Sequence, residues 1–104
     1  MTLQANTYLP ALPGGVTPDS LQVLQEDSAA HEALLRQIIR GFERKYGCAL
    51  EVFEQRLASG QSPEHPGWEE SIEWRNAVEE LERTRVSRSI FAWLNNLLVR
   101  SAAS

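Results

Sequence analysis

The chain has 104 residues but only one cysteine, Cys48, and two histidines. A single cysteine cannot form an internal disulfide, so the sequence excludes the disulfide framework on which many small secreted domains depend. A zinc site needs three or four ligands brought together, and Cys48, His31 and His65 have none of the spacings typical of such sites. We therefore expect no metal and no other cofactor, and we expect Cys48 to be a small buried side chain and not a nucleophile.

Long apolar runs and an excess of basic residues are also missing. No stretch approaches the ~20 apolar residues that a membrane-spanning helix needs, and the N-terminus lacks the basic start and apolar centre of a signal peptide. These features predict a soluble, cytoplasmic protein that does not bind membranes. The formal net charge of −4 opposes general nucleic-acid binding, because the phosphate backbone favours clustered lysine and arginine. The same charge weakly favours a basic partner.

Helix-breaking residues are absent from the C-terminal third, which has no proline after Pro66 and no glycine after Gly67. The segment from Pro66 to about Val99 therefore predicts one helix, about 50 Å long at ~1.5 Å per residue. A single domain of this size is roughly 30 Å across, so we expect a second copy to cover part of the apolar stripe. The positions expected to face inward are Trp68, Ile72, Val78, Leu81, Ile90, Trp93, Leu94 and Leu97.

The charges of this predicted helix are divided between its two halves. Seven acids and one base, Arg75, lie between Glu64 and Glu82, whereas four arginines and no acid follow from Arg83 onward. This order suits the helix macrodipole, and it also favours antiparallel pairing of two copies about a two-fold axis near Glu82 and Arg83. A solvated helix adapted only to its own dipole is the alternative. We expect self-association through Val78, Leu81, Ile90, Trp93, Leu94 and Leu97.

The N-terminal segment, residues 1–16, is rich in proline and glycine, which predicts an extended or partly disordered arm. Its apolar residues can still dock on the helices; they are Tyr8, Leu9, Leu12 and Val16. Residues 17–104 are predicted to form a single helical domain. Thr17 followed by Pro18 predicts an N-cap and a first helical residue. Whether residues 17–46 form one helix or two stays open, because Asp27 or Ser28 can cap a fresh start.

Two further helices are indicated before the long one. Apolar residues recur at helical spacing from about Ala29 to Tyr46, and Gly47 is the expected stop. A second helix is predicted from about Leu50 to Ser59, with Gly60 after it. We therefore predict an all-α fold of three to four helices with a long C-terminal helix, in an antiparallel homodimeric helical bundle.

Little in the chain suggests catalysis. Neighbouring carboxylates such as Glu79 and Glu80 lie along a helix face expected to be solvated, whereas acid–base catalysis needs two carboxylates in different environments of one cleft. We expect no enzymatic activity. Trp74 is more informative, because it falls about 60° from the stripe of Ile72 and Val78 at ~100° per residue. Contact with another chain and packing in the core are equally weighted explanations for it.

The order of several short motifs resembles a group of small helical bacterial and archaeal proteins. The motifs, which span about residues 40–82, are F-E-R-K-Y-G at 42–47, L-E-V-F-E-Q-R-L at 50–57, His65-Pro66, Trp68-Glu69 and Glu73-Trp74. Several proteins of that group lie beside small toxin-like genes and are regarded as antitoxins. This chain departs from the group at Ala49, where the group has a capping Ser, Thr or Asp, in the segment from Arg83 to Arg100, and in its proline-rich start.

The resemblance implies a non-enzymatic partner-binding protein that neutralises a small basic toxin. We expect its partner face to comprise Trp68, Glu69, Glu73 and Trp74. One alternative is a structural or regulatory homodimer, or an adaptor, without a toxin partner. A less favoured alternative is a transcriptional regulator that contacts DNA through Arg83, Arg85 and Arg88.

Overall fold

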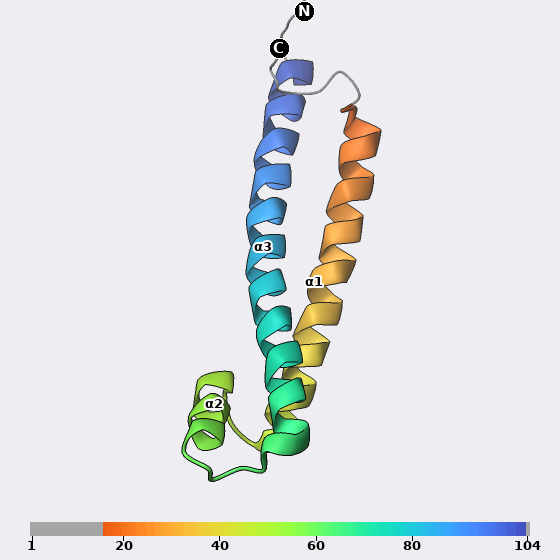
Figure 1. Ribbon diagram of the computed structural model, residues 1–104. Coiled ribbons are helices and arrows are strands. Elements are labelled where there is room, and N and C mark those ends of the chain that lie inside the picture. The colour runs from red at the N-terminus through yellow and green to blue at the C-terminus, as the bar shows by residue number, and fades with distance from the viewer. Residues whose placement is uncertain (1–15, 104) are drawn as a thin grey trace, which may run out of the picture.

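A computed structural model describes residues 16–103 and shows three helices, α1 (Pro18–Tyr46), α2 (Leu50–Ala58) and α3 (Glu64–Ala103). The long helices α1 and α3 lie side by side in opposite directions, and the short α2 packs beside the closed end of this hairpin (Figure 1). The described part contains no strand. The structure therefore confirms the all-helical class and the long C-terminal helix.

The first helix is continuous from Pro18 to Tyr46, which answers the question that the sequence left open. At its start, the Thr17 hydroxyl accepts the Ser20 backbone N–H at 3.0 Å, and the Ser20 hydroxyl accepts the Thr17 N–H at 2.8 Å. This reciprocal capping box satisfies two N–H groups that otherwise lack partners. Gly47 ends the helix in the left-handed conformation, at φ 68°, as predicted. Ser28 does not begin a new helix, because its hydroxyl donates to the Gln25 carbonyl within α1.

The core lies at the closed end, where all three helices meet. Leu50, Phe53 and Leu57 of α2 pack with Trp74 of α3, and each of the four side chains is almost fully buried. Around them lie half-buried residues from α1, from the turn after it and from α3; these are Ile39, Phe42, Tyr46, Cys48 and Val78. Aromatic stacking joins the three helices, with ring centroids 5.5 Å apart for Phe42 and Trp74 and 5.7 Å apart for Phe53 and Trp74.

The sequence misassigned the inward face of α3. The buried positions on this helix are Gly67, Ser71, Trp74, Ala77 and Thr84. Four of the residues expected to face inward are instead half or more exposed, and these are Trp68, Ile72, Ile90 and Trp93. The other four are half-buried, and these are Val78, Leu81, Leu94 and Leu97. The prediction was wrong because small residues lie on a different side of α3, where the other helices pack. A β-carbon at Gly67 would lie 2.7 Å from Leu57 of α2, whereas Ala77 and Thr84 lie beside α1.

In the hairpin, part of α3 is covered by α1 of the same chain. We expected α3 to need a second copy along its stripe, but α1 packs along one side of it. The contacts include an ion pair between Arg88 of α3 and Glu32 of α1, with Nη1 and Oε1 2.6 Å apart. The exposed apolar residues therefore form a second face of α3, which α1 leaves open. The predicted N-terminal arm, apart from Val16, and the expected docking of Tyr8, Leu9 and Leu12 lie outside the described residues, whereas Val16 is half-buried.

Candidate interaction surfaces

The four residues predicted as a partner face do not share one surface. Trp68, Glu69 and Glu73 are exposed on the first turns of α3. Trp74 is only 1% exposed and is enclosed by rings from α1 and α2. Its assignment to a partner face was therefore wrong, and packing in the core accounts for its position. Trp74, which lies off the main apolar stripe, is on the side of α3 that α1 and α2 cover.

Side chains from α1 hold the first turns of α3 in place. The Lys45 ammonium lies 2.7 Å from a carboxylate oxygen of Glu70, and the Tyr46 hydroxyl also donates to that carboxylate. These two hydrogen bonds, first that from Lys45 and then that from Tyr46, lower the pKa of Glu70. From α2, Glu54 accepts a hydrogen bond from Arg75 at 2.8 Å. Contacts with α1 and α2 thus fix the position of this part of α3.

We define the outer face of α3 as Trp68, Ile72, Val86, Ile90 and Trp93. Their exposed fractions range from 50% at Ile90 to 60% at Trp93, which is unusual for side chains of this size. At 3.6 residues per turn, these positions lie opposite the buried Ala77 and Thr84, which face α1, and so point away from α1. Contiguous exposed apolar side chains mark interaction sites more often than isolated ones do.

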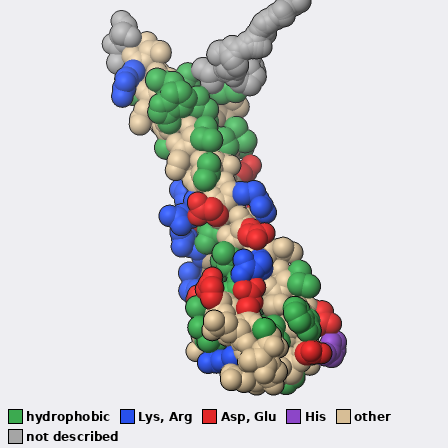
Figure 2. Space-filling model, turned by 60° about the vertical axis from the view of Figure 1, so that its left-hand side comes forward, with side chains coloured by type: hydrophobic (Ala, Val, Ile, Leu, Met, Phe, Trp, Pro, Cys, Tyr) green, Lys and Arg blue, Asp and Glu red, His purple; other side chains and the backbone are tan. Residues whose placement is uncertain are grey.

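Charged residues divide this outer face into two apolar ends. Arg75, Glu79 and Arg83 lie between Ile72 and Val86 at helical spacing. On the side of the molecule formed by α3, the space-filling view shows hydrophobic side chains gathered at both ends with acidic and basic side chains between them (Figure 2). Among the residues that the structure describes, Arg83 pairs with Glu80 at 2.8 Å, whereas the only ion-pair partner of Glu79 is Arg75, at 4.0 Å.

A second surface is a shallow groove of about 540 Å³ between α1 and α3, which we call the α1–α3 groove. Its apolar lining comes from both helices and consists of Leu35, Ile38, Phe42 and Ala77. Its polar lining comes from α3 alone and consists of Glu73, Asn76 and Glu80. Glu80 accepts hydrogen bonds from Arg83 and His31, which lower its pKa, Arg83 having the larger effect. Within residues 16–103 the Glu73 carboxylate has no hydrogen-bond or ion-pair partner.

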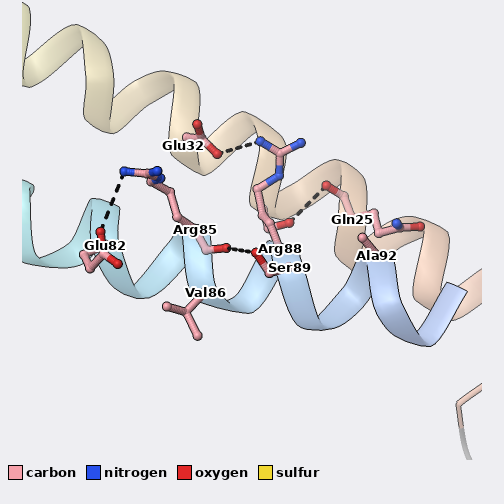
Figure 3. Close-up of a pocket in the computed structure, with 9 residues that line it drawn as sticks. Gln25, Glu32, Glu82, Arg85, Val86, Arg88, Ser89 and Ala92 are labelled. Atoms are coloured by element: carbon pink, nitrogen blue, oxygen red, sulfur yellow. Dashed lines mark hydrogen bonds and ion pairs between the residues drawn. The ribbon is translucent and has the colours of Figure 1, made fainter. Parts of the chain in front are cut away.

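A third surface, also between α1 and α3, is polar (Figure 3). Glu32 lies 2.6 Å from Arg88 and 2.7 Å from Arg36, and these two arginines, Arg88 first, lower the pKa of Glu32. Arg85 lies 3.7 Å from Glu82. The arginines that line this groove therefore already face carboxylates of the same chain. The arrangement stabilises the hairpin, and it offers no convergent pair of groups in distinct environments for acid–base chemistry.

The sequence alone did not indicate the α1–α3 groove as a site. Glu73 was predicted to contact a partner, but Ile38 and Phe42 were predicted only as parts of one inward face. Ile38 is in fact exposed and Phe42 half-buried, because α3 covers only one side of this stripe. The apolar stripe on α1 is wider than one neighbouring helix can cover. This width is the feature of the sequence from which an open apolar groove could have been predicted.

Comparison with protein-family models, with curated proteins and with solved structures found no match to this chain. Among residues 16–103, no three side chains of His, Cys, Asp or Glu come together as a potential metal site. The same residues include no helix with the length and apolar character to cross a bilayer.

Proposed function

We propose that this protein is a non-enzymatic protein-binding module of the antitoxin-like type, which takes an amphipathic basic helix of a small partner protein in the α1–α3 groove. The observation that carries the proposal is the composition of that groove. Its floor is apolar and open, whereas its α3 side has Glu73, whose carboxylate has no partner in the described chain. An amphipathic helix binds such a groove through apolar anchors spaced three and four residues apart.

Charge supports a basic partner over an acidic one. Glu69 lies one turn before Glu73 on α3, and both are exposed. The chain as a whole has a net charge of −4. Complementary charge of this kind raises association rates and penalises acidic competitors, while the apolar floor supplies most of the affinity.

We also propose that the protein is a homodimer, in which two hairpins form an antiparallel helical bundle through α3. Support comes from the outer face of α3, whose large apolar side chains α1 does not cover. Sedimentation at micromolar concentration should give about twice the chain mass of 11.7 kDa. If no toxin binds in the groove, the alternative function is that of a structural or regulatory homodimer.

DNA binding is not the function that we propose. Arg83, Arg85 and Arg88 each lie within 4 Å of a carboxylate in the chain, on Glu80, Glu82 and Glu32 respectively. A phosphate backbone has to compete with these carboxylates, whereas DNA-binding surfaces present uncompensated positive charge.

The groove assignment is testable with a model ligand. We would label a helical Leu/Lys peptide with leucines three and four residues apart, and measure binding by fluorescence anisotropy. Ile38→Asp and Glu73→Lys should each weaken binding at least tenfold, because one places a charge on the apolar floor and the other reverses the charge of the rim.

Matched controls are available on α2. Val52 is 40% exposed and Ile38 is 39% exposed, so Val52→Asp places the same new charge at equal exposure but outside the groove. Glu51→Lys is the corresponding control for Glu73→Lys. A peptide of identical composition without an apolar face should bind at least tenfold more weakly. If groove and control variants bind the peptide equally, the groove is not the site.

A further inference from the structure

We propose that the outer face of α3 binds the same face of a second copy, with the two α3 helices antiparallel and the two-fold axis level with Leu81. This inference rests on the proposed homodimer and specifies its surface, direction and register. Its central contact is an ion pair between Glu79 of each copy and Arg83 of the other.

The order of residues along the outer face carries the inference. Glu79 and Arg83 lie two residues on either side of Leu81, and Ile72 and Ile90 lie nine residues on either side. Trp68 lies 13 residues before Leu81 and Trp93 lies 12 after it. Four of the five apolar positions therefore recur at nearly equal distances on either side of Leu81, whereas Val86 faces the position of Asn76, and the two central charges have opposite sign.

This pattern selects the antiparallel arrangement. About an axis level with Leu81, Ile72 of one copy meets Ile90 of the other, and Glu79 meets Arg83 twice, once on each side of the axis. A parallel arrangement also brings apolar residues together, but it sets Glu79 against Glu79 and Arg83 against Arg83. Like charges in contact are unfavourable, so the central charges determine the direction.

Both charged side chains are accessible for such contacts. Within residues 16–103 the Glu79 carboxylate has only a 4.0 Å contact with Arg75, and Arg83 is exposed while it contacts Glu80 on its own helix. Arg83 therefore retains surface that a second acid can reach. Exposed ion pairs contribute little to affinity, so the two Glu79–Arg83 contacts specify register while the apolar ends hold the copies together.

The area of the face predicts a dimer of modest affinity. Each of its five side chains is half or more exposed and offers roughly 100 Å² to a partner. Two copies would then bury about 1,000 Å² through these residues, near the lower limit for specific interfaces. The α1–α3 groove lies on another side of the hairpin and stays open, so pairing through α3 and ligand binding in the groove are compatible.

Disulfide trapping tests the register directly. In a Cys48→Ala background, we would make Ile72→Cys and Ile90→Cys separately, and oxidise each variant alone and then the two mixed. In the proposed dimer, positions 72 and 90 meet, while the two copies of either position are about 27 Å apart at ~1.5 Å per residue. We expect a covalent dimer in the mixture and none in either variant alone.

Charge reversal gives a second, independent measurement. By sedimentation equilibrium at low salt, Glu79→Arg or Arg83→Glu alone should raise the dissociation constant about tenfold, because each makes two like-charged contacts. The double variant should return to within about threefold of the parent. Glu43→Lys, at an exposed position on α1, is the control for altered net charge and should leave the constant unchanged. Far-UV circular dichroism confirms that each variant is folded.

The outcomes separate this inference from the proposed function. Covalent dimers of Ile72→Cys alone would show a parallel arrangement and overturn the inference. A parent protein that is dimeric, yet gives no covalent dimer in the mixture, would overturn the α3 register and leave the homodimer standing. A parent that is monomeric up to millimolar concentration would overturn both the inference and the homodimer, whereas the groove proposal is decided by peptide binding.

Discussion

Replacing Trp74 by alanine should destabilise the fold strongly, because this ring joins all three helices. It is 1% exposed and stacks on Phe42 of α1 and Phe53 of α2, with Tyr46 6.2 Å away between ring centroids. The change removes contacts that α1 and α2 both make with α3. It therefore acts on the core in which the three helices meet.

The magnitude follows from the area that the indole buries. A tryptophan buries roughly 200 Å², which at ~25 cal/mol per Å² is about 5 kcal/mol as an upper bound, since the unfolded chain already hides some surface. Alanine keeps the β-carbon, while the cavity and the lost stacking add to the cost. We expect Trp74→Ala to lower the free energy of unfolding by about 3 to 5 kcal/mol.

Urea denaturation followed by far-UV circular dichroism measures this change. Trp93→Ala is the matched control, because Trp93 is on the same helix and 60% exposed. At a submicromolar concentration, where the proposed dimer dissociates, Trp93→Ala should change the free energy of unfolding by less than about 1 kcal/mol. If Trp74→Ala costs no more than Trp93→Ala, the aromatic core does not hold the fold and the reasoning fails.

Two further predictions concern helix ends. Ala49 caps α2 in an extended conformation with no side-chain hydrogen bond, so Ala49→Ser should raise the free energy of unfolding by roughly 0.5 to 1 kcal/mol in thermal denaturation. Ala30→Ser, within α1, is the control, and Ala49→Ser must be the more stable of the two. Gly41→Ala and Gly47→Ala make the same change where an added β-carbon meets nothing within 4 Å. Because only Gly47 has a positive φ, Gly41→Ala should stabilise by about 1 kcal/mol and Gly47→Ala should destabilise by about as much, and equal effects would contradict this account.

The helices and most of their ends could be predicted because they depend on neighbouring residues. The capping box joins Thr17 and Ser20, which are three positions apart, and Gly47 ends α1 through its own backbone conformation. The absence of proline and glycine after Gly67 was sufficient to predict a long final helix. Interactions between residues only a few positions apart do not depend on the rest of the fold.

The faces that these helices present were decided by the tertiary structure. The sequence showed apolar residues on two sides of α3, and the one with more of them was taken as the inward side. In the structure, Gly67, Ala77 and Thr84 allow close approach on the other side, and Trp74 fills the remaining space there. The periodicity of a sequence shows where apolar residues lie around a helix, but it does not show against which side a neighbouring helix packs.

The α1–α3 groove illustrates the same limit between distant residues. Ile38 and Glu73 are 35 positions apart in the chain and line one groove because α1 and α3 pack in a single register. That register is set by contacts such as Lys45 with Glu70 and Glu32 with Arg88, each between residues far apart in the sequence. The sequence determined which segments are helical and where α1 stops, and only the packing of the hairpin decided which side chains are enclosed and which remain available to a partner.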